Sequence, residues 1–236
     1  MTISRSQLDI YGGQDPRNIP AYGFNEAARY LKIAPATLRS WVIGRLYPLR
    51  ERTGFFEPLI PLPDSNENKL SFANLVEAHV LRSLRTEHSV SIQAVRHALQ
   101  YAQSQFNIKR LLLSPELLAG AGELFLNKYS ELISLSKSGQ FVLRKVLESY
   151  LKRIEWENDL PIRLYPFLRE ETADDARPIV INPFISFGRP IIERKSVSTA
   201  TIVDRFDAGE TESELAADYD LEISEIETAI IYELAA

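Results

Sequence analysis

The 236-residue chain contains no cysteine, and it has only three histidines, two tryptophans and one methionine. Without cysteine it has no disulfide, no thiolate metal ligand and no thiol nucleophile. No apolar run reaches the roughly 18 residues that a membrane-spanning helix needs, and the first residues lack the apolar segment of a secretory signal. We therefore expect a cytoplasmic protein with ordinary hydrophobic cores.

The residue types that carry catalysis or bind metals are poorly placed for either task. His79, His88 and His97 have none of the close spacings of a zinc site. The acid pairs Glu170-Glu171 and Asp174-Asp175 lie in a charged segment without apolar residues that would tune a carboxyl pKa. There is no phosphate-binding glycine pattern and no nucleophile elbow. We predict no enzymatic activity, no metal and no other cofactor.

Charge is distributed unevenly along the chain, whose formal net charge is −5. Residues 1–105 hold 12 Lys and Arg against 9 Asp and Glu, whereas residues 176–236 hold 5 against 12. Because affinity for nucleic acid depends on the local field at the contact surface, the first segment is the candidate for DNA binding. The acidic last segment is better suited to a basic protein partner, or is simply solvated.

Two short helical patterns near the N-terminus predict a helix-turn-helix. Residues 24–31 contain strong helix formers, and Pro35 suits the first turn of a second helix that Gly44 ends. Possible strands at 46–49 and 55–60, joined by a turn at 50–54, would add a wing. A second helix in this arrangement is the one that enters the DNA major groove.

Long side chains that carry hydrogen-bond donors and short side chains that carry hydroxyl groups are the candidate DNA contacts in this region. Arg39 can donate two hydrogen bonds to guanine or bridge phosphates, and Thr37 and Ser40 suit the DNA backbone. The wing arginines fit phosphate contacts and a solvated turn equally well. The full set of DNA-binding candidates is Arg29, Thr37, Arg39, Ser40, Arg45, Arg50 and Arg52.

For the rest of the chain the sequence predicts a helical middle region followed by a small module. Helical periods occur within 71–105 and 114–158, where a stripe through Leu143, Leu147 and Ile154 could face the core or a second subunit. Strands at 179–181 and 187–192 and three helices at 199–207, 213–219 and 224–234 follow. We predict a mainly α fold with an N-terminal winged helix-turn-helix, a helical middle, and a C-terminal helix-turn-helix-like module with a short β hairpin.

The basic cluster of the acidic module, with the neighbouring Phe187, is the candidate protein-binding site: Phe187, Arg189, Arg194 and Lys195. A phosphate contact and an ordinary charged loop are the alternatives. The expected organisation is a lead-in at 1–20, a DNA-binding domain at 21–105, a helical middle or dimerisation region at 106–160, a linker at 161–177 and a C-terminal domain at 178–236.

Two stretches resemble known families. Glu26-Ala27-Ala28, Thr37-Leu38-Arg39 and the residues from Leu81 to Leu99 resemble a MerR-type winged helix-turn-helix. Gly188-Arg189-Pro190-Ile191-Ile192, with Glu214-Leu215-Ala216, is similar to the domain-of-unknown-function 433 family, which includes VapB-type antitoxins.

This resemblance implies a type II antitoxin that neutralises a PIN-like ribonuclease toxin and represses its own operon by binding operator DNA. We expect a homodimer, because two DNA-binding domains can bind the two half-sites of an operator. Two alternatives stay open: a MerR-like one-component regulator that senses a small ligand and has no toxin, and an interaction module whose helix-turn-helix no longer binds DNA.

Overall fold

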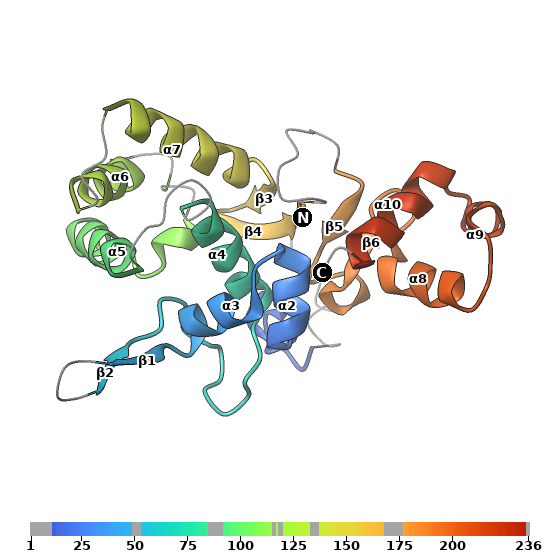
Figure 1. The fold of residues 1–236 in the computed structure, drawn as a ribbon, viewed down its shortest axis with the longest axis horizontal. Helices are drawn as coiled ribbons and strands as arrows, with labels where there is room; N and C mark the ends of the chain where they lie inside the picture. Colours follow the sequence, from blue (N-terminus) through green and yellow to red (C-terminus); the bar gives the residue numbers. More distant parts are fainter. Residues whose placement is uncertain are drawn as a thin grey trace. The chain divides into compact units, whose positions relative to one another are not determined.

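The computed structural model describes residues 11–48, 53–84, 92–114, 117, 120–132, 137–167 and 177–234. Helices dominate these residues and two small antiparallel sheets accompany them (Figure 1), which confirms the mainly α prediction. The chain forms two compact units, one from Met1–Leu75 with Ile162–Ala236 and one from Val76–Pro161. Outside the described residues lie Arg50, Arg52, His88, Glu170, Glu171, Asp174 and Asp175.

The first unit contains the predicted helix pair, α2 (Phe24–Leu31) and α3 (Pro35–Val42). The amide of Gly23 donates to the Glu26 carboxylate at 3.3 Å and so closes the first turn of α2. Lys32 ends that helix with a left-handed backbone, φ 52°, which allows the Ile33 amide to donate to the Ala28 carbonyl at 2.9 Å. Pro35 then starts α3, where no amide donor is needed.

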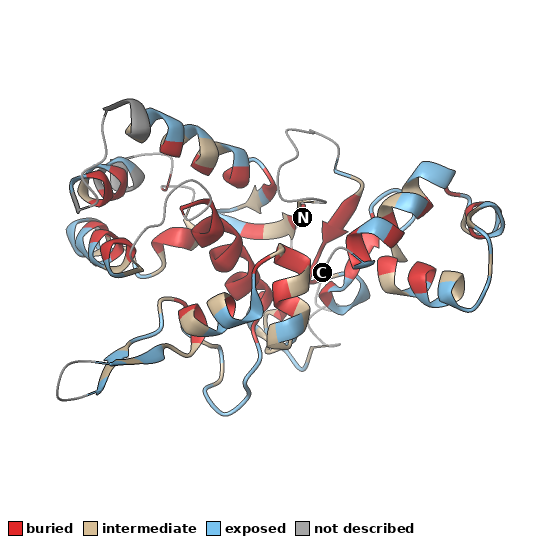
Figure 2. Cartoon of the chain, viewed as in Figure 1, coloured by how far each residue is buried: buried red, intermediate tan, exposed pale blue. Residues whose placement is uncertain are grey.

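Both helices contain buried positions, coloured red in Figure 2. The amides of Leu59 and Ile60 both donate to the carbonyl of Trp41, at 2.7 and 3.0 Å, and so fasten the following segment to the end of α3. An antiparallel bridge between Tyr22 and Leu70 closes the region. The buried residues of the pair are Ala27, Ala28, Tyr30, Leu31, Leu38, Trp41 and Val42.

A wing follows α3 and consists of β1 (Arg45–Pro48) and β2 (Thr53–Phe56), paired in antiparallel register. The predicted second strand, 55–60, was partly wrong. It begins earlier, at Thr53, and ends at Phe56, because Pro58 lacks an amide donor and the next two amides bind Trp41. Gly44 precedes the wing with φ 86°, and a Cβ there would overlap with the Phe56 carbonyl.

Helix α4 (Phe72–Ser83) begins at the start of the helical period predicted from residue 71. The Ser71 hydroxyl accepts from the Asn74 amide at 3.3 Å, and the Asn74 side chain donates to the Pro61 carbonyl at 2.9 Å.

The C-terminal part of the first unit has consecutive antiparallel strands followed by three helices. β4 (Leu160–Leu164), β5 (Ile179–Ile181), β6 (Pro190–Ile192) and β7 (Val197–Ser198) pair in sequence order. The helices are α8 (Thr199–Asp207), α9 (Glu212–Tyr219) and α10 (Ile223–Leu234), all within one residue of the predicted starts. Thr211 and Glu214 form a capping box at the start of α9.

The second unit is helical apart from one strand. After α4 it contains α5 (Ile92–Phe106), the short 3-10 turn η2 (Leu111–Leu113), α6 (Gly120–Leu132), α7 (Lys137–Leu151) and β3 (Ile154–Glu157). The prediction that Ile154 continues a helix was wrong. Asn158 and Asp159 both have positive φ, 50° and 61°, as a tight hairpin turn requires, so the preceding residues become a strand.

Two buried polar side chains of the second unit, Glu77 and His79, have hydrogen-bond partners. The Arg110 guanidinium donates to both oxygens of Glu77 at 2.9 and 2.6 Å. The Nε2–H of His79 donates to the Tyr150 carbonyl at 3.0 Å. In the part of the chain that the structure describes, no helix combines the length and apolarity needed to cross a bilayer, and no three potential ligand side chains are grouped to hold a metal ion.

Candidate nucleic-acid interface

Helix α3 separates its polar and apolar side chains. Leu38 and Trp41 are buried, Arg39 is exposed, and Thr37 and Ser40 are partly exposed. The Ser40 hydroxyl donates to the Thr37 carbonyl at 2.7 Å. The Arg39 guanidinium lies 5.4 Å from the centroid of the Phe24 ring, a cation–π contact that orients it on the outer face. Helix α3 therefore presents the residues that the recognition-helix hypothesis requires.

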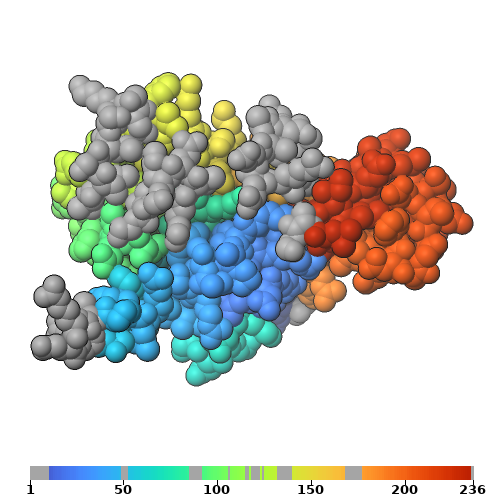
Figure 3. Space-filling view, in the orientation of Figure 1, coloured from blue at the N-terminus to red at the C-terminus, as the bar shows by residue number. Residues whose placement is uncertain are grey.

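The wing adds a second basic residue beside α3. Arg45 is exposed, and its guanidinium lies 5.3 Å from the centroid of the Phe56 ring, which stacks on Tyr47 with centroids 4.0 Å apart. A Cβ at Gly54 would overlap with the Tyr47 ring, so glycine permits this stack. Among the described residues, no acidic side chain forms an ion pair with Arg39 or Arg45. Figure 3 shows the helix pair and wing as one continuous blue surface.

Arg29 does not join this group. Its guanidinium forms an ion pair with Glu233 of α10, whose side chain is only 4% exposed, and lies 5.1 Å from the centroid of the Tyr30 ring. The other carboxylate oxygen of Glu233 accepts from the Thr199 hydroxyl. Arg29 thus connects the helix-turn-helix to the C-terminal helices.

Further contacts between α2 and α10 strengthen this connection. The Lys32 ammonium donates to the Tyr232 carbonyl at 2.6 Å and lies 4.5 Å from the centroid of its ring. The Tyr232 hydroxyl donates to the Tyr30 carbonyl at 3.1 Å, and burial raises the pKa of Tyr232 well above its usual value. Sequence reasoning missed these contacts, because no local pattern signals pairing between the two ends of a chain.

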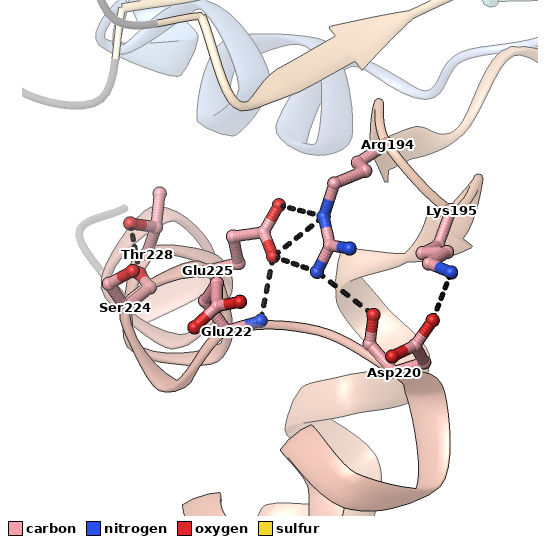
Figure 4. Close-up of polar contacts among 7 residues, drawn as sticks. All are labelled: Arg194, Lys195, Asp220, Glu222, Ser224, Glu225 and Thr228. Atoms are coloured by element: carbon pink, nitrogen blue, oxygen red, sulfur yellow. Dashed lines mark hydrogen bonds and ion pairs between the residues drawn. The ribbon is translucent and has the colours of Figure 1, made fainter.

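Two of the protein-binding candidates are engaged within the C-terminal module (Figure 4). Arg194 donates to Glu225 at 2.7 Å and to the Asp220 carbonyl at 2.9 Å, and Lys195 pairs with the Asp220 carboxylate. Hydrogen bonding to Glu225 raises the pKa of Arg194, and the same bond lowers the pKa of Glu225. These side chains connect the turn between β6 and β7 to the end of α9 and the start of α10.

The other two candidates, Phe187 and Arg189, lie together at a different place. Both are exposed, and both line a cavity of about 310 Å³ in the first unit. Among the described residues, Arg189 has no acidic ion-pair partner. The four predicted residues therefore form two separate pairs with different surroundings.

Both ends of the chain match known protein families. Residues 20–99 match the family described as "Putative DNA-binding HTH domain", and residues 179–232 match "Protein of unknown function (DUF433)". The chain contains an HTH domain and a DUF433 domain. Both predicted modules are thereby confirmed at this level, whereas the MerR-like and VapB-type assignments stay predictions.

Individual relatives cover nearly the whole chain. "Putative antitoxin VapB45" of Mycobacterium tuberculosis (strain ATCC 25618 / H37Rv) is 26% identical over 230 residues, which are 90% of this chain and 93% of the relative. "Uncharacterized protein Rv2308" of the same organism is 26% identical over 218 residues, 89% of each chain. The crystal structure of Rv2018 from Mycobacterium tuberculosis superposes with a TM-score of 0.64 at 23% identity, covering 90% and 98% of the two chains, and shares the fold.

Proposed function

We propose that this protein is a non-enzymatic type II antitoxin that binds DNA and represses its own operon as a homodimer. The observation that carries the proposal is the polar face of α3, with Arg39 exposed and Thr37 and Ser40 partly exposed, beside Arg45 of the wing. It is supported by the HTH match over residues 20–99 and by a relative of nearly equal length whose name is "Putative antitoxin VapB45".

The proposed DNA complex places α3 in the major groove. Arg39 donates to a guanine edge or to phosphates, and the hydroxyls of Thr37 and Ser40 contact the backbone. Arg45 contacts a flanking phosphate from the wing, and Arg50 and Arg52, outside the described residues, are further candidates from the sequence. Buried Leu38 and Trp41 fix the helix, so its polar side chains are held in place before DNA binds.

The proposed toxin is a PIN-like ribonuclease that binds the C-terminal module. Phe187 and Arg189 are exposed there, whereas Arg194 and Lys195 already bind Asp220 and Glu225. We therefore place the toxin contact at Phe187 and Arg189 and give Arg194 and Lys195 a supporting role. Helix α10 of this module contacts α2, and α2 packs against α3. Toxin binding to the module would therefore change the position of α2 and, through it, DNA binding by α3.

Replacement of the recognition-helix arginine tests the DNA proposal. Arg39→Ala should weaken binding to the DNA upstream of the gene by about tenfold, since a good arginine contact contributes roughly 1–3 kcal/mol. Binding is measured by gel shift at fixed salt. The control is Arg144→Ala on α7, where the replaced arginine pairs with exposed Glu123. Unchanged affinity of the Arg39 variant, or an equal loss in the control, would contradict the assigned helix.

Co-expression tests the toxin proposal. The product of the neighbouring open reading frame should arrest growth alone and be neutralised by the full-length chain, and Arg189→Ala should weaken both rescue and co-purification. A neighbouring gene that encodes no growth inhibitor, with DNA binding intact, would favour the alternative of a MerR-like regulator without a toxin. The cavity beside Arg189 is the observation in favour of that alternative.

A further inference from the structure

A cavity of about 310 Å³ lies in the first unit, between residues 11–26 and the segment that joins β5 to β6. This volume is at the lower end of small-molecule sites, which span about 300–1,000 Å³. Its lining combines apolar, aromatic and charged groups. The residues involved are Tyr11, Pro16, Ile19, Pro20, Ala21, Tyr22, Glu26, Pro183, Phe187 and Arg189.

The walls of the cavity are fixed by long-range hydrogen bonds. The Tyr11 hydroxyl donates to the Pro183 carbonyl at 3.0 Å, and the Tyr22 hydroxyl donates to the Gly188 carbonyl at 2.9 Å. Gly188 has φ 75°, and a Cβ there would overlap with the Tyr22 hydroxyl. The cavity is thus formed before any ligand binds, which lowers the entropic cost of binding.

The backbone beside the cavity is strained. Ser186 and Phe187, in the turn η4 (Ser186–Gly188), have φ of 53° and 54°, in the left-handed region that costs roughly 1–2 kcal/mol for each non-glycine residue. This strain holds a phenyl side chain that is 69% exposed, with its ring edge-on to Tyr11 at 6.0 Å. Strain that leaves an apolar ring in solvent does not stabilise the fold and is typical of a binding surface.

Two opposite charges line the same cavity. The Glu26 carboxylate accepts from the Gly23 amide and, at 2.8 Å, from the Tyr30 hydroxyl, which leaves lone pairs for a further donor. The Arg189 guanidinium is exposed and has no acidic ion-pair partner among the described residues. An anion alone would meet the charge of Glu26, and a cation alone would meet that of Arg189.

We propose that this cavity binds a small zwitterion with an apolar or aromatic body, of which a free aromatic or aliphatic α-amino acid is the simplest. Its carboxylate binds Arg189, its ammonium binds Glu26, and its side chain packs against the rings of Tyr11, Tyr22 and Phe187. The site goes beyond the antitoxin proposal, and because it shares Phe187 and Arg189 with the proposed toxin contact, the amino acid and the toxin would compete for them. Because its lining comes from the start of α2 and from the DUF433 domain, its occupant would stabilise their association.

Calorimetric titration and thermal denaturation of the full-length protein test the site. L-phenylalanine, L-tryptophan and L-leucine are the probes, and at least one should bind saturably and raise the Tm at millimolar concentration. Arg189→Gln should raise its Kd about tenfold by removing a charge-assisted contact. Phe187→Ala should weaken binding without unfolding, because the ring is exposed. Arg194→Gln is the matched control and should bind normally.

Analogues test the charge requirement. Phenylpropanoate lacks the ammonium group and phenethylamine lacks the carboxylate, so both should bind at least tenfold more weakly than phenylalanine. No binding by any of the three amino acids would overturn the proposal. Equal binding of phenylpropanoate would overturn the zwitterion assignment, and undiminished binding by the Arg189 variant would overturn the location.

Discussion

His79 is a buried imidazole in the helical second unit. Its Nε2–H donates to the Tyr150 carbonyl at 3.0 Å. Burial lowers the pKa of His79 to about 3, and the charges of Arg82 and Arg153 also lower it. The hydrogen bond to the Tyr150 carbonyl raises the pKa and offsets part of this shift. The side chain is therefore neutral in the folded protein at every pH above strongly acidic conditions.

This lowered pKa predicts an acid-sensitive stability. The unfolded chain, with an ordinary histidine pKa near about 6.5, takes up the proton first, so the free energy of unfolding falls as the pH drops from about 6.5 toward 3. Between pH 7 and pH 5 the loss should be about 2 kcal/mol.

Urea denaturation of the wild type and of His79→Gln measures this contribution. Glutamine keeps an N–H donor for the Tyr150 carbonyl but does not titrate, so its stability should fall less with pH. Parallel pH profiles for the two proteins would show that His79 carries no such linkage.

At the scale of helices and strands, α2 is held from two sides. It packs against α3 within the helix-turn-helix, and its basic residues bind α10 through Glu233 and the Tyr232 carbonyl. The Glu233 carboxylate is nearly fully buried and also accepts from the Thr199 hydroxyl of α8. One acidic side chain therefore links three helices.

Removal of this carboxylate should destabilise the first unit. Glu233→Ala leaves Arg29 and Thr199 without their shared acceptor and should lower the free energy of unfolding by about 2–3 kcal/mol, moderated by the partial exposure of Arg29. Chemical denaturation measures the loss, and hydrogen exchange should show faster opening of α2. The control is Glu227→Ala, an exposed position on the same helix. A loss no larger than that of the control would contradict the linking role.

Local sequence patterns predicted the helices more reliably than the strands. α2 and α8 have the predicted bounds, because capping residues, proline positions and apolar periods are encoded within a few residues. The end of β2 depends on where Trp41 places its carbonyl, and the β3 strand depends on a turn at Asn158 and Asp159. Such features require partners or backbone angles that an apolar stripe does not specify.

The same distinction holds for the candidate site. Leu38 and Trp41 are buried on one face of α3, and the helical period therefore puts Arg39 on a different, exposed face. The partner of Arg29 lies near the other end of the chain, and neither periodicity nor spacing could predict it. The cavity was also missed, since its walls come from two segments, residues 11–26 and 183–189, that lie far apart in the sequence.

At the scale of the molecule, residues from both ends of the chain build one unit. The HTH domain and the DUF433 domain match separate families, yet Lys32, Tyr30 and Arg29 bind directly to α10. A ligand that changes these contacts at one module would couple to the other module. This association gives a physical route by which a protein partner on the C-terminal module would alter DNA binding.

The most direct test of the central claim is photo-crosslinking of the full-length protein to the DNA upstream of its gene. A photoreactive residue replaces Arg39 in one variant and exposed Lys145 of α7 in another. In a complex formed at low salt, position 39 should crosslink to the DNA and position 145 should not. Crosslinking at 145 but not at 39, or no complex with this DNA at all, would contradict the account.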